Sequence, residues 1–167
     1  PRPNPEGSNP DMGAYENALG TPLVPPPPLP VINETMQNPS EVQDSYGEWF
    51  EIFNAGTIDI DLEGWVIRDN GDDYHTISAS VPVGAGEYVV LGNNSDFSTN
   101  GGVNVDYQYA SDFSLGNGSD ELFFIAPNGV TVDSVAWDNG ATFPDPNGAS
   151  MSLLDPGLDN SIGSNWT

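Results

Sequence analysis

The chain has 167 residues, of which 25 are Asp or Glu and only 2 are Lys or Arg, so its formal net charge is −23. A chain so poor in basic residues cannot neutralise phosphate groups, and we expect no direct binding of nucleic acid or of an anionic membrane surface. The absence of Cys excludes disulfides, thiolate metal sites and thiol nucleophiles. The hydrophobic residues, 37% of the chain, therefore have to build a packed core.

Residues 1–30 hold ten of the 16 prolines. Proline fixes φ and removes a backbone donor, so this stretch is predicted to be an extended, polyproline II-rich linker or arm. Proline-rich segments also dock into aromatic grooves, but no basic residue flanks this one, and the linker interpretation is favoured. No run of apolar residues is long enough to insert into a membrane.

From Val31 to the last residue, short apolar runs alternate with Asn, Asp, Gly and Pro. This spacing is typical of an all-β sandwich or barrel, and residues 31–167 are predicted to form one antiparallel β-sandwich domain of about nine strands with almost no helix. The candidate strands are Val31–Met36, Glu48–Asn54, Asp59–Leu62, Trp65–Asp69, His75–Ala79, Tyr88–Leu91, Val105–Tyr109, Glu121–Ala126, Val130–Trp137 and Ser150–Leu154.

Turn chemistry and alternation add detail to this outline. Asn128-Gly129 tolerates the positive φ of a tight turn, so the apolar runs on either side should form a hairpin. In the second candidate strand, Phe50 and Ile52 share the buried side, while Trp49, Glu51 and Phe53 share the wetter one. In the fourth, Trp65 and Ile67 should point inward and Val66 and Arg68 outward.

Several short motifs, in order, resemble the lamin tail domain family. They are Gly47-Glu48-Trp49-Phe50-Glu51-Ile52-Phe53-Asn54, Asp61-Leu62-Glu63-Gly64-Trp65-Val66-Ile67-Arg68-Asp69, Gly86-Glu87-Tyr88-Val89-Val90-Leu91, Gly118-Ser119-Asp120-Glu121-Leu122, Val132-Asp133-Ser134-Val135-Ala136-Trp137, Gly148-Ala149-Ser150-Met151-Ser152-Leu153-Leu154 and Asn165-Trp166. The resemblance implies an immunoglobulin-like β-sandwich. It also implies a setting: bacterial members of the family look like non-catalytic modules attached to secreted nucleases, phosphatases and surface proteins. Nuclear members serve filament and chromatin attachment.

This chain departs from the nuclear members because it lacks their basic character, and from many bacterial members because Ala149 stands where they carry Arg. The first departure argues against a chromatin role. The resemblance therefore favours a non-catalytic interaction or spacer module, extracellular or at a cell surface and attached to other domains of a larger bacterial protein.

The catalytic inventory is small. His75 is the only imidazole and so the only candidate base for a serine-type triad, and its position at the start of an exposed strand makes this role improbable. Paired carboxylates could support a small hydrolase, because a glycosidase needs only two of them. Glu34, Glu48 and Glu51 are the candidates, but a sandwich with short loops offers little cleft. We predict that the protein is not an enzyme.

Calcium is the candidate cofactor that the composition best supports. Loops rich in Asp, Asn and Gly present the oxygen ligands that this ion prefers, and the candidate ligands are Asp69, Asp72, Asp73 and Asp120. No EF-hand loop is complete. The competing interpretation, a solvated acidic surface with Asx turns, is the favoured one.

Four aromatic residues form a candidate ligand platform: Trp49, Phe53, Tyr107 and Tyr109. The first two lie on the wetter side of their strand, and the tyrosines alternate along one face of a predicted edge strand. Flat rings on a sheet can hold the apolar faces of sugars, so the alternative function is a carbohydrate-binding module, with or without calcium. The predicted partner is a protein or a cell-surface glycan.

Overall fold

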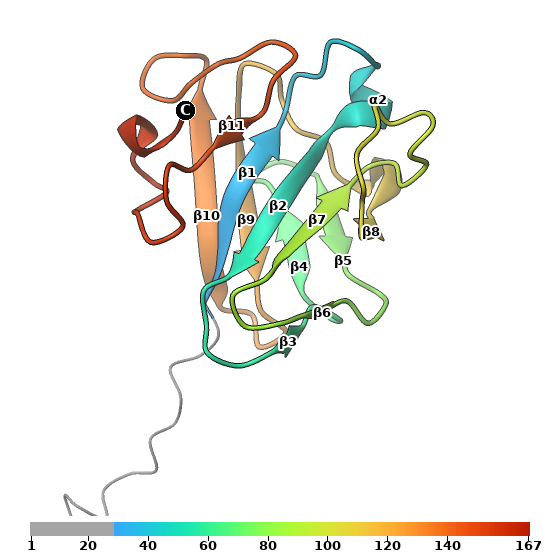
Figure 1. Cartoon of the computed structure of the whole chain (residues 1–167), viewed down its shortest axis with the longest axis vertical. Helices are drawn as coiled ribbons and strands as arrows, with labels where there is room; N and C mark the ends of the chain where they lie inside the picture. Colours follow the sequence, from blue (N-terminus) through green and yellow to red (C-terminus); the bar gives the residue numbers. More distant parts are fainter. Residues whose placement is uncertain (1–28) are drawn as a thin grey trace, which may run out of the picture.

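The computed structural model describes residues 29–167, which fold into two packed β-sheets (Figure 1). The larger sheet has the order β11-β1-β2-β7-β8 and contains Met151–Ser152 (β11), Pro30–Met36 (β1), Trp49–Asn54 (β2), Tyr88–Gly92 (β7) and Tyr107–Gln108 (β8). The smaller sheet has the order β10-β9-β4-β5 and contains Thr131–Asp138 (β10), Ser119–Ile125 (β9), Val66–Arg68 (β4) and Tyr74–Thr76 (β5).

The remaining regular elements are short. Ile60–Asp61 (β3) pairs with Pro82–Val83 (β6) in a separate two-stranded ladder. The helical elements of residues 29–167 are Asp44–Gly47 (α2), Ala110–Asp112 (η2) and Gly163–Asn165 (η3). The predicted all-β class is confirmed, and none of the described helices is long and apolar enough to cross a membrane.

Most strand pairs are antiparallel, as predicted, but one is not. Leu91 of β7 lies beside Tyr107 of β8 in a parallel pair. This corrects the expectation of a purely antiparallel sandwich: the chain leaves β7, crosses back through residues 93–106 and returns to the same sheet edge in the same direction. β1 begins at Pro30, one residue before the predicted domain boundary, and residues 1–28 of the predicted linker lie outside the described residues.

The core between the sheets follows the predicted alternation. Phe50 and Ile52 are fully buried, and so is Ile67, while Trp65 stacks on Phe124 with ring centroids 4.8 Å apart. Burying side chains of this size stabilises each by roughly 1.5 to 3 kcal/mol relative to exposure. The outward-facing residues of β2 and β4 are only partly buried.

The predicted hairpin is also present. β9 and β10 pair antiparallel around a turn in which Gly129 has a φ of +83° and donates its N–H to the carbonyl of Ala126 at 2.8 Å. Glycine adopts this left-handed conformation without the steric penalty that a Cβ would bring.

One open side of the sandwich is closed by side chains. β1 and β10 belong to different sheets, and Asp133 of β10 accepts the backbone N–H of Ile32 at 2.6 Å. Asn160 completes the link, because its Nδ2 donates to Asp133 at 2.7 Å and to the carbonyl of Ile32 at 3.2 Å. Both strands have a register shift next to these residues, which frees the backbone groups for side-chain partners.

Candidate functional site: the outer face of the five-stranded sheet

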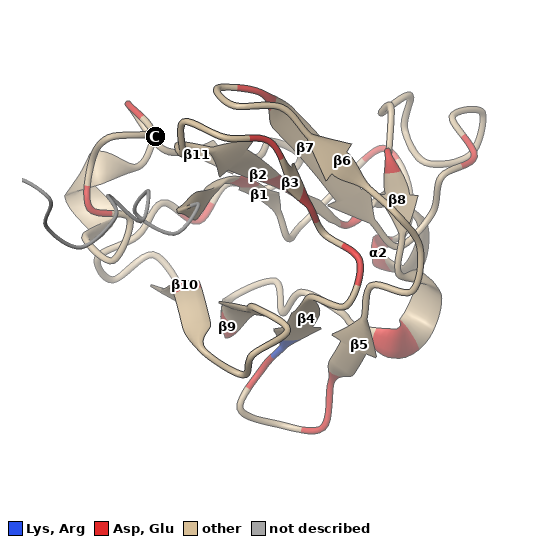
Figure 2. Ribbon diagram, turned by 90° about the horizontal axis from the view of Figure 1, so that it is seen from below, with Lys and Arg blue, Asp and Glu red and all other residues tan. Residues whose placement is uncertain are grey.

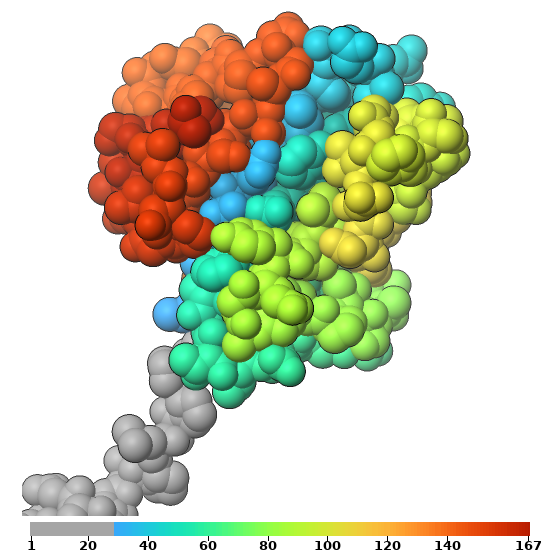
Figure 3. Space-filling view, in the orientation of Figure 1, coloured from blue at the N-terminus to red at the C-terminus, as the bar shows by residue number. Residues whose placement is uncertain are grey.

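The outer face of the five-stranded sheet is set back between two raised parts of the molecule. In the space-filling view, β1 and β2 (blue to teal) lie between the C-terminal segment (red) and the loop after β7 (yellow) (Figure 3). The residues of β2 that point to this face are Trp49, Glu51 and Phe53, each only partly buried. Alternation along the strand puts them there, because their neighbours Phe50 and Ile52 fill the core.

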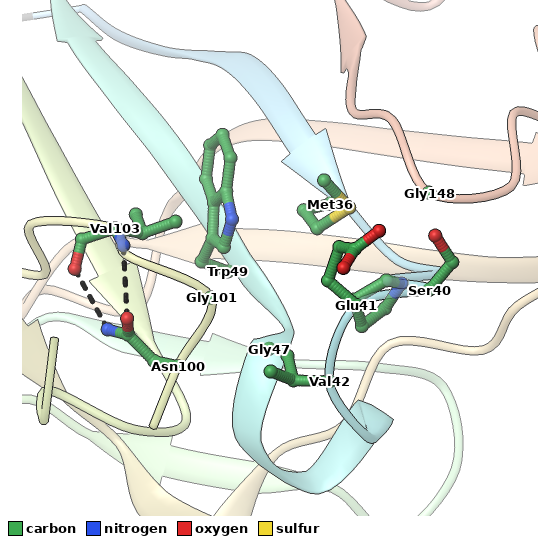
Figure 4. A pocket seen from close by; sticks show the side chains of 11 residues that line it. Met36, Ser40, Glu41, Val42, Gly47, Trp49, Asn100, Gly101, Val103 and Gly148 are labelled. Atoms are coloured by element: carbon green, nitrogen blue, oxygen red, sulfur yellow. Dashed lines mark hydrogen bonds between the residues drawn. The ribbon is translucent and has the colours of Figure 1, made fainter. Parts of the chain in front are cut away.

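Trp49 forms one wall of a small pocket at one end of this face, which we call the Trp49 pocket (Figure 4). Its volume is about 150 Å³. Figure 4 shows the indole standing between Met36 and Val103, with Val42 close by. Asn100 fixes the Val103 wall, because its Nδ2 donates to the carbonyl of Val103 at 2.8 Å and its Oδ1 accepts the N–H at 3.0 Å.

The chemistry of this pocket is an apolar floor with a polar rim. Ser40, Glu41 and Asn100 supply hydroxyl, carboxylate and amide groups around the aliphatic and indole surfaces. A cavity of this volume holds a group about the size of one benzene ring. The pocket therefore fits a single apolar side chain or one face of a sugar ring.

A second aromatic group lies further along the same face. The Phe53 and Tyr88 rings are tilted against each other with centroids 4.6 Å apart, and Tyr88 is 49% exposed. Trp49 and Phe53 are four positions apart on β2, which separates them by about 13 Å in an extended strand. The face thus offers two aromatic contacts at the spacing of side chains four positions apart in an extended ligand.

Two carboxylates lie between the aromatic groups. Glu34 of β1 is directly opposite Glu51 of β2. Burial, with a further contribution from Glu34, raises the pKa of Glu51 above its usual value, while the Asn33 amide, which donates to Glu51 at 2.8 Å, opposes the shift. Ser150 donates its hydroxyl to Glu34. The middle of the face is therefore acidic and rich in acceptors.

The structure divides the predicted aromatic platform. Trp49 and Phe53 lie on the outer face, but Tyr107 and Tyr109 point to the opposite side of the sheet. Tyr109 is fully buried, stacked near Phe50 with centroids 5.9 Å apart. The prediction that Tyr109 belongs to an exposed platform is therefore wrong, because Tyr107 of β8 and Tyr109, just after β8, both point toward the core.

Tyr107 instead joins β8 to β5 through His75. The Nε2 of His75 lies 2.8 Å from the Tyr107 hydroxyl and its Nδ1 lies 2.8 Å from Asp112, while the Tyr107 oxygen also accepts the N–H of Ser78 at 3.0 Å. Both ring nitrogens of His75 therefore have partners. The hydroxyl beside the imidazole is that of Tyr107, which accepts a backbone N–H, and it is not the serine hydroxyl that a serine-type triad requires. The arrangement ties the open edge between the two sheets together.

The predicted calcium ligands gather at one end of the smaller sheet, but they are engaged by backbone donors. Asp69 accepts the N–H of Asp73 at 3.1 Å, Asp73 accepts that of Ser114 at 2.9 Å, and Asp120 accepts that of Gly116 at 2.6 Å. Asp72 is exposed. Within residues 29–167 no three His, Cys, Asp or Glu side chains converge in a way that could hold a metal ion. Calcium binding stays a prediction.

Sequence reasoning missed Tyr88, and it placed Glu48 only among candidate acids. Tyr88 was detectable, since it occupies the outward parity of its strand opposite Phe53. Glu48 was detectable too, because alternation puts it on the same side as the buried Phe50 and Ile52, and it is only 5% exposed. Asn93 follows the end of β7, and the sequence marked it only as part of a candidate calcium loop over residues 93–96.

Comparison with known families fits this architecture. The family model of the lamin tail domain matches residues 25–139, which include every strand from β1 to β10. The chain belongs to the lamin tail domain family. Lamin tail domains have the immunoglobulin-like fold, mediate interactions and are generally non-catalytic. A search of curated proteins found no match.

Proposed function

We propose that this lamin tail domain is a non-catalytic interaction module of a larger secreted or cell-surface bacterial protein, and that it holds its partner on the outer face of the five-stranded sheet. The observation that supports this most directly is the Trp49 pocket, in which a partly exposed indole, Met36 and Val103 surround an open space. Apolar pockets rimmed by a few polar groups are the usual anchor points for a ligand.

A protein partner is the primary candidate. The face combines two aromatic anchors with the Glu34 and Glu51 carboxylates between them, so it suits an extended segment that brings an apolar side chain to the pocket and donors or positive charge to the centre. A glycan is the second candidate, because exposed Trp and Tyr rings flanked by acceptors also suit the faces and hydroxyls of sugars.

The proposal is tested by screening the whole chain against a peptide-display library and a glycan array, each with and without calcium. We expect ligands that the Trp49→Ala variant loses, with a fall in affinity of about tenfold or more, as for truncation of an aromatic anchor. Tyr74→Ala is the matched control, because Tyr74 is 58% exposed but lies on β5 of the other sheet.

Ligands that bind Trp49→Ala as well as the unchanged chain, and that Tyr74→Ala loses, would refute the placement of the site. Calcium-dependent glycan binding would move the assignment to a carbohydrate-binding module.

A further inference from the structure

A second pocket, the Glu48 pocket, lies on the other side of the segment that carries Trp49. It opens between α2, the residue after β7 and the segment around η2, and its volume is about 420 Å³. The residues of its wall that matter here are Asp44, Ser45, Glu48, Asn93, Ala110 and Ser111. Glu48 and Asn93 are 5% and 7% exposed, so the pocket has a buried polar floor.

The hydrogen bonds of this floor leave acceptors without donors. Through Oε2, Glu48 accepts the N–H of Leu115 at 3.1 Å and the Nδ2 of Asn93 at 3.5 Å, and within residues 29–167 its Oε1 has no donor. Asn93 donates its Nδ2 to the carbonyl of Asp44 at 2.6 Å, which leaves the Oδ1 as the free end of the amide. That Oδ1 is buried without a partner in the described part of the chain. A buried acceptor in this state has lost its hydration without gaining a donor, which is unfavourable.

The pocket also lacks a compensating positive charge. Burial, together with Asp44, Asp120 and Asp73, raises the pKa of Glu48 to about 7. The chain contains no Lys, and Arg68 is the only Arg of the described part. It lies on β4, where its guanidinium is 4.7 Å from the centre of the Phe123 ring (Figure 2).

The wall formed by η2 is held in place before any ligand arrives. Ala110 has a φ of +56°, a left-handed conformation that is unfavourable for a residue with a Cβ. The segment keeps this conformation because Asp112 is bound to His75 and Ser114 donates both its N–H and its hydroxyl to Asp73. The pocket is therefore preorganised rather than formed by a loose loop.

We propose that the Glu48 pocket binds the ammonium group of a lysine side chain supplied by a partner protein. An ammonium has three donors and no acceptor, which matches Glu48 Oε1, Asn93 Oδ1 and the hydroxyls at the rim. The methylene stem of lysine would lie against Ala110, which is exposed in the wall of the pocket, as such stems do on apolar surfaces. Arginine fits less well, because a two-pronged guanidinium needs both carboxylate oxygens and Oε2 already accepts from Leu115 and from Asn93.

This inference rests on the proposed interaction role but not on the Trp49 pocket, so the two can fail separately. The test is a titration of the whole chain at pH 8 with Nα-acetyl-lysine methylamide, followed by two-dimensional NMR. The reporters are the backbone amide of Leu115 and the side-chain amide of Asn93. We expect saturable shifts of both signals, and none with the Nε-acetylated probe, which has lost the charge and two donors.

Three variants sharpen the test. Glu48→Gln keeps the shape and an acceptor for Leu115 but removes the charge, and it should weaken binding about tenfold or more. Glu63→Gln is the control for the loss of one negative charge, because Glu63 is an exposed carboxylate after β3 and outside both pockets, and this variant should bind like the unchanged chain. Ser111→Lys places a tethered ammonium at the exposed rim and should block the probe while the fold is retained.

The result that overturns the inference is equal affinity of Glu48→Gln and the unchanged chain, or no shift at any lysine concentration. Shifts of the same signals with calcium chloride and none with the lysine probe would also overturn it, in favour of a metal ion. If the lysine probe binds normally while Trp49→Ala retains every ligand of the screen, the Glu48 pocket stands and the outer-face proposal fails.

Discussion

At the scale of single residues, Glu48 is a carboxyl group whose ionised form the fold disfavours. Its carboxyl is buried beside the core tyrosine Tyr109, and three other carboxylates surround it, so its pKa is raised to about 7. Burial is the largest cause, because a charged carboxylate loses its hydration there, and the N–H of Leu115 only partly opposes this. A residue of this kind makes the stability of the fold depend on pH.

We predict that Glu48→Gln stabilises the domain at pH 8 relative to pH 5. The unfolded carboxyl ionises near 4.5 and the folded one near 7, so the folded state keeps the proton longer and loses stability as the pH rises through this window. At 1.36 kcal/mol per pKa unit, and after allowance for screening from the open side of the pocket, the difference should grow by roughly 2 kcal/mol between the two pH values. Urea unfolding at both values measures it.

Glu41→Gln, which changes an exposed carboxylate, is the control for the loss of one negative charge. If both variants gain the same stability between pH 5 and pH 8, the effect comes from net charge and the raised pKa of Glu48 plays no part.

At the scale of elements, the link between β1 and β10 decides how the two sheets stay together on one side. Asn160→Ala should destabilise the domain by about 1 to 3 kcal/mol, because Asp133 loses a donor and the carbonyl of Ile32 loses its side-chain partner in a buried setting. Urea unfolding measures the change. Ser161→Ala, at the next position but exposed, should cost much less, and equal losses for the two variants would contradict a specific role for the link.

The elements also show how far sequence reasoning reaches. All ten predicted strands have counterparts, because each combines alternating apolar residues with flanking turn residues, and the Asn128-Gly129 hairpin follows from turn chemistry alone. β6 was missed, since Pro82–Val83 is too short to alternate. The parallel pairing of β8 was missed because strand direction depends on the path of residues 93–106, which no local pattern encodes.

The candidate site was predictable only where alternation decides it. Trp49 and Phe53 were placed on the outer face by the parity of β2, and the structure puts them there. Tyr109 lies two positions after Tyr107 of β8, so alternation puts both side chains on the same side. The local sequence does not indicate which side of an edge strand faces the core. The Glu48 pocket joins residues of α2 and η2 with Glu48 and Asn93, which follow α2 and β7, so it arises from tertiary packing alone.

At the scale of the whole molecule, the segment after residue 139 adds core residues and a strand that the region matched by the family model does not include. The match ends at residue 139, yet the core also contains Phe143, Met151, Leu153 and Trp166 from beyond it. Trp166 is bridged to Leu153, donates its indole N–H to the carbonyl of Asn160 at 2.9 Å and lies 6.2 Å from the Phe143 ring. β11 from this segment forms one edge of the five-stranded sheet.

A chain ending at residue 139 should therefore fail to fold. Removing a large buried side chain costs about 2 to 5 kcal/mol, so losing four of them together with β11 and the Asn160 link is comparable to the 5 to 15 kcal/mol that stabilises a typical domain. Near-ultraviolet circular dichroism and amide chemical-shift dispersion would report the loss. Trp166→Ala in the full chain is the graded comparison and should stay folded with a lowered melting temperature. A truncated chain with native dispersion would show instead that β1 to β10 are a self-sufficient sandwich, and that the last 28 residues only cover it.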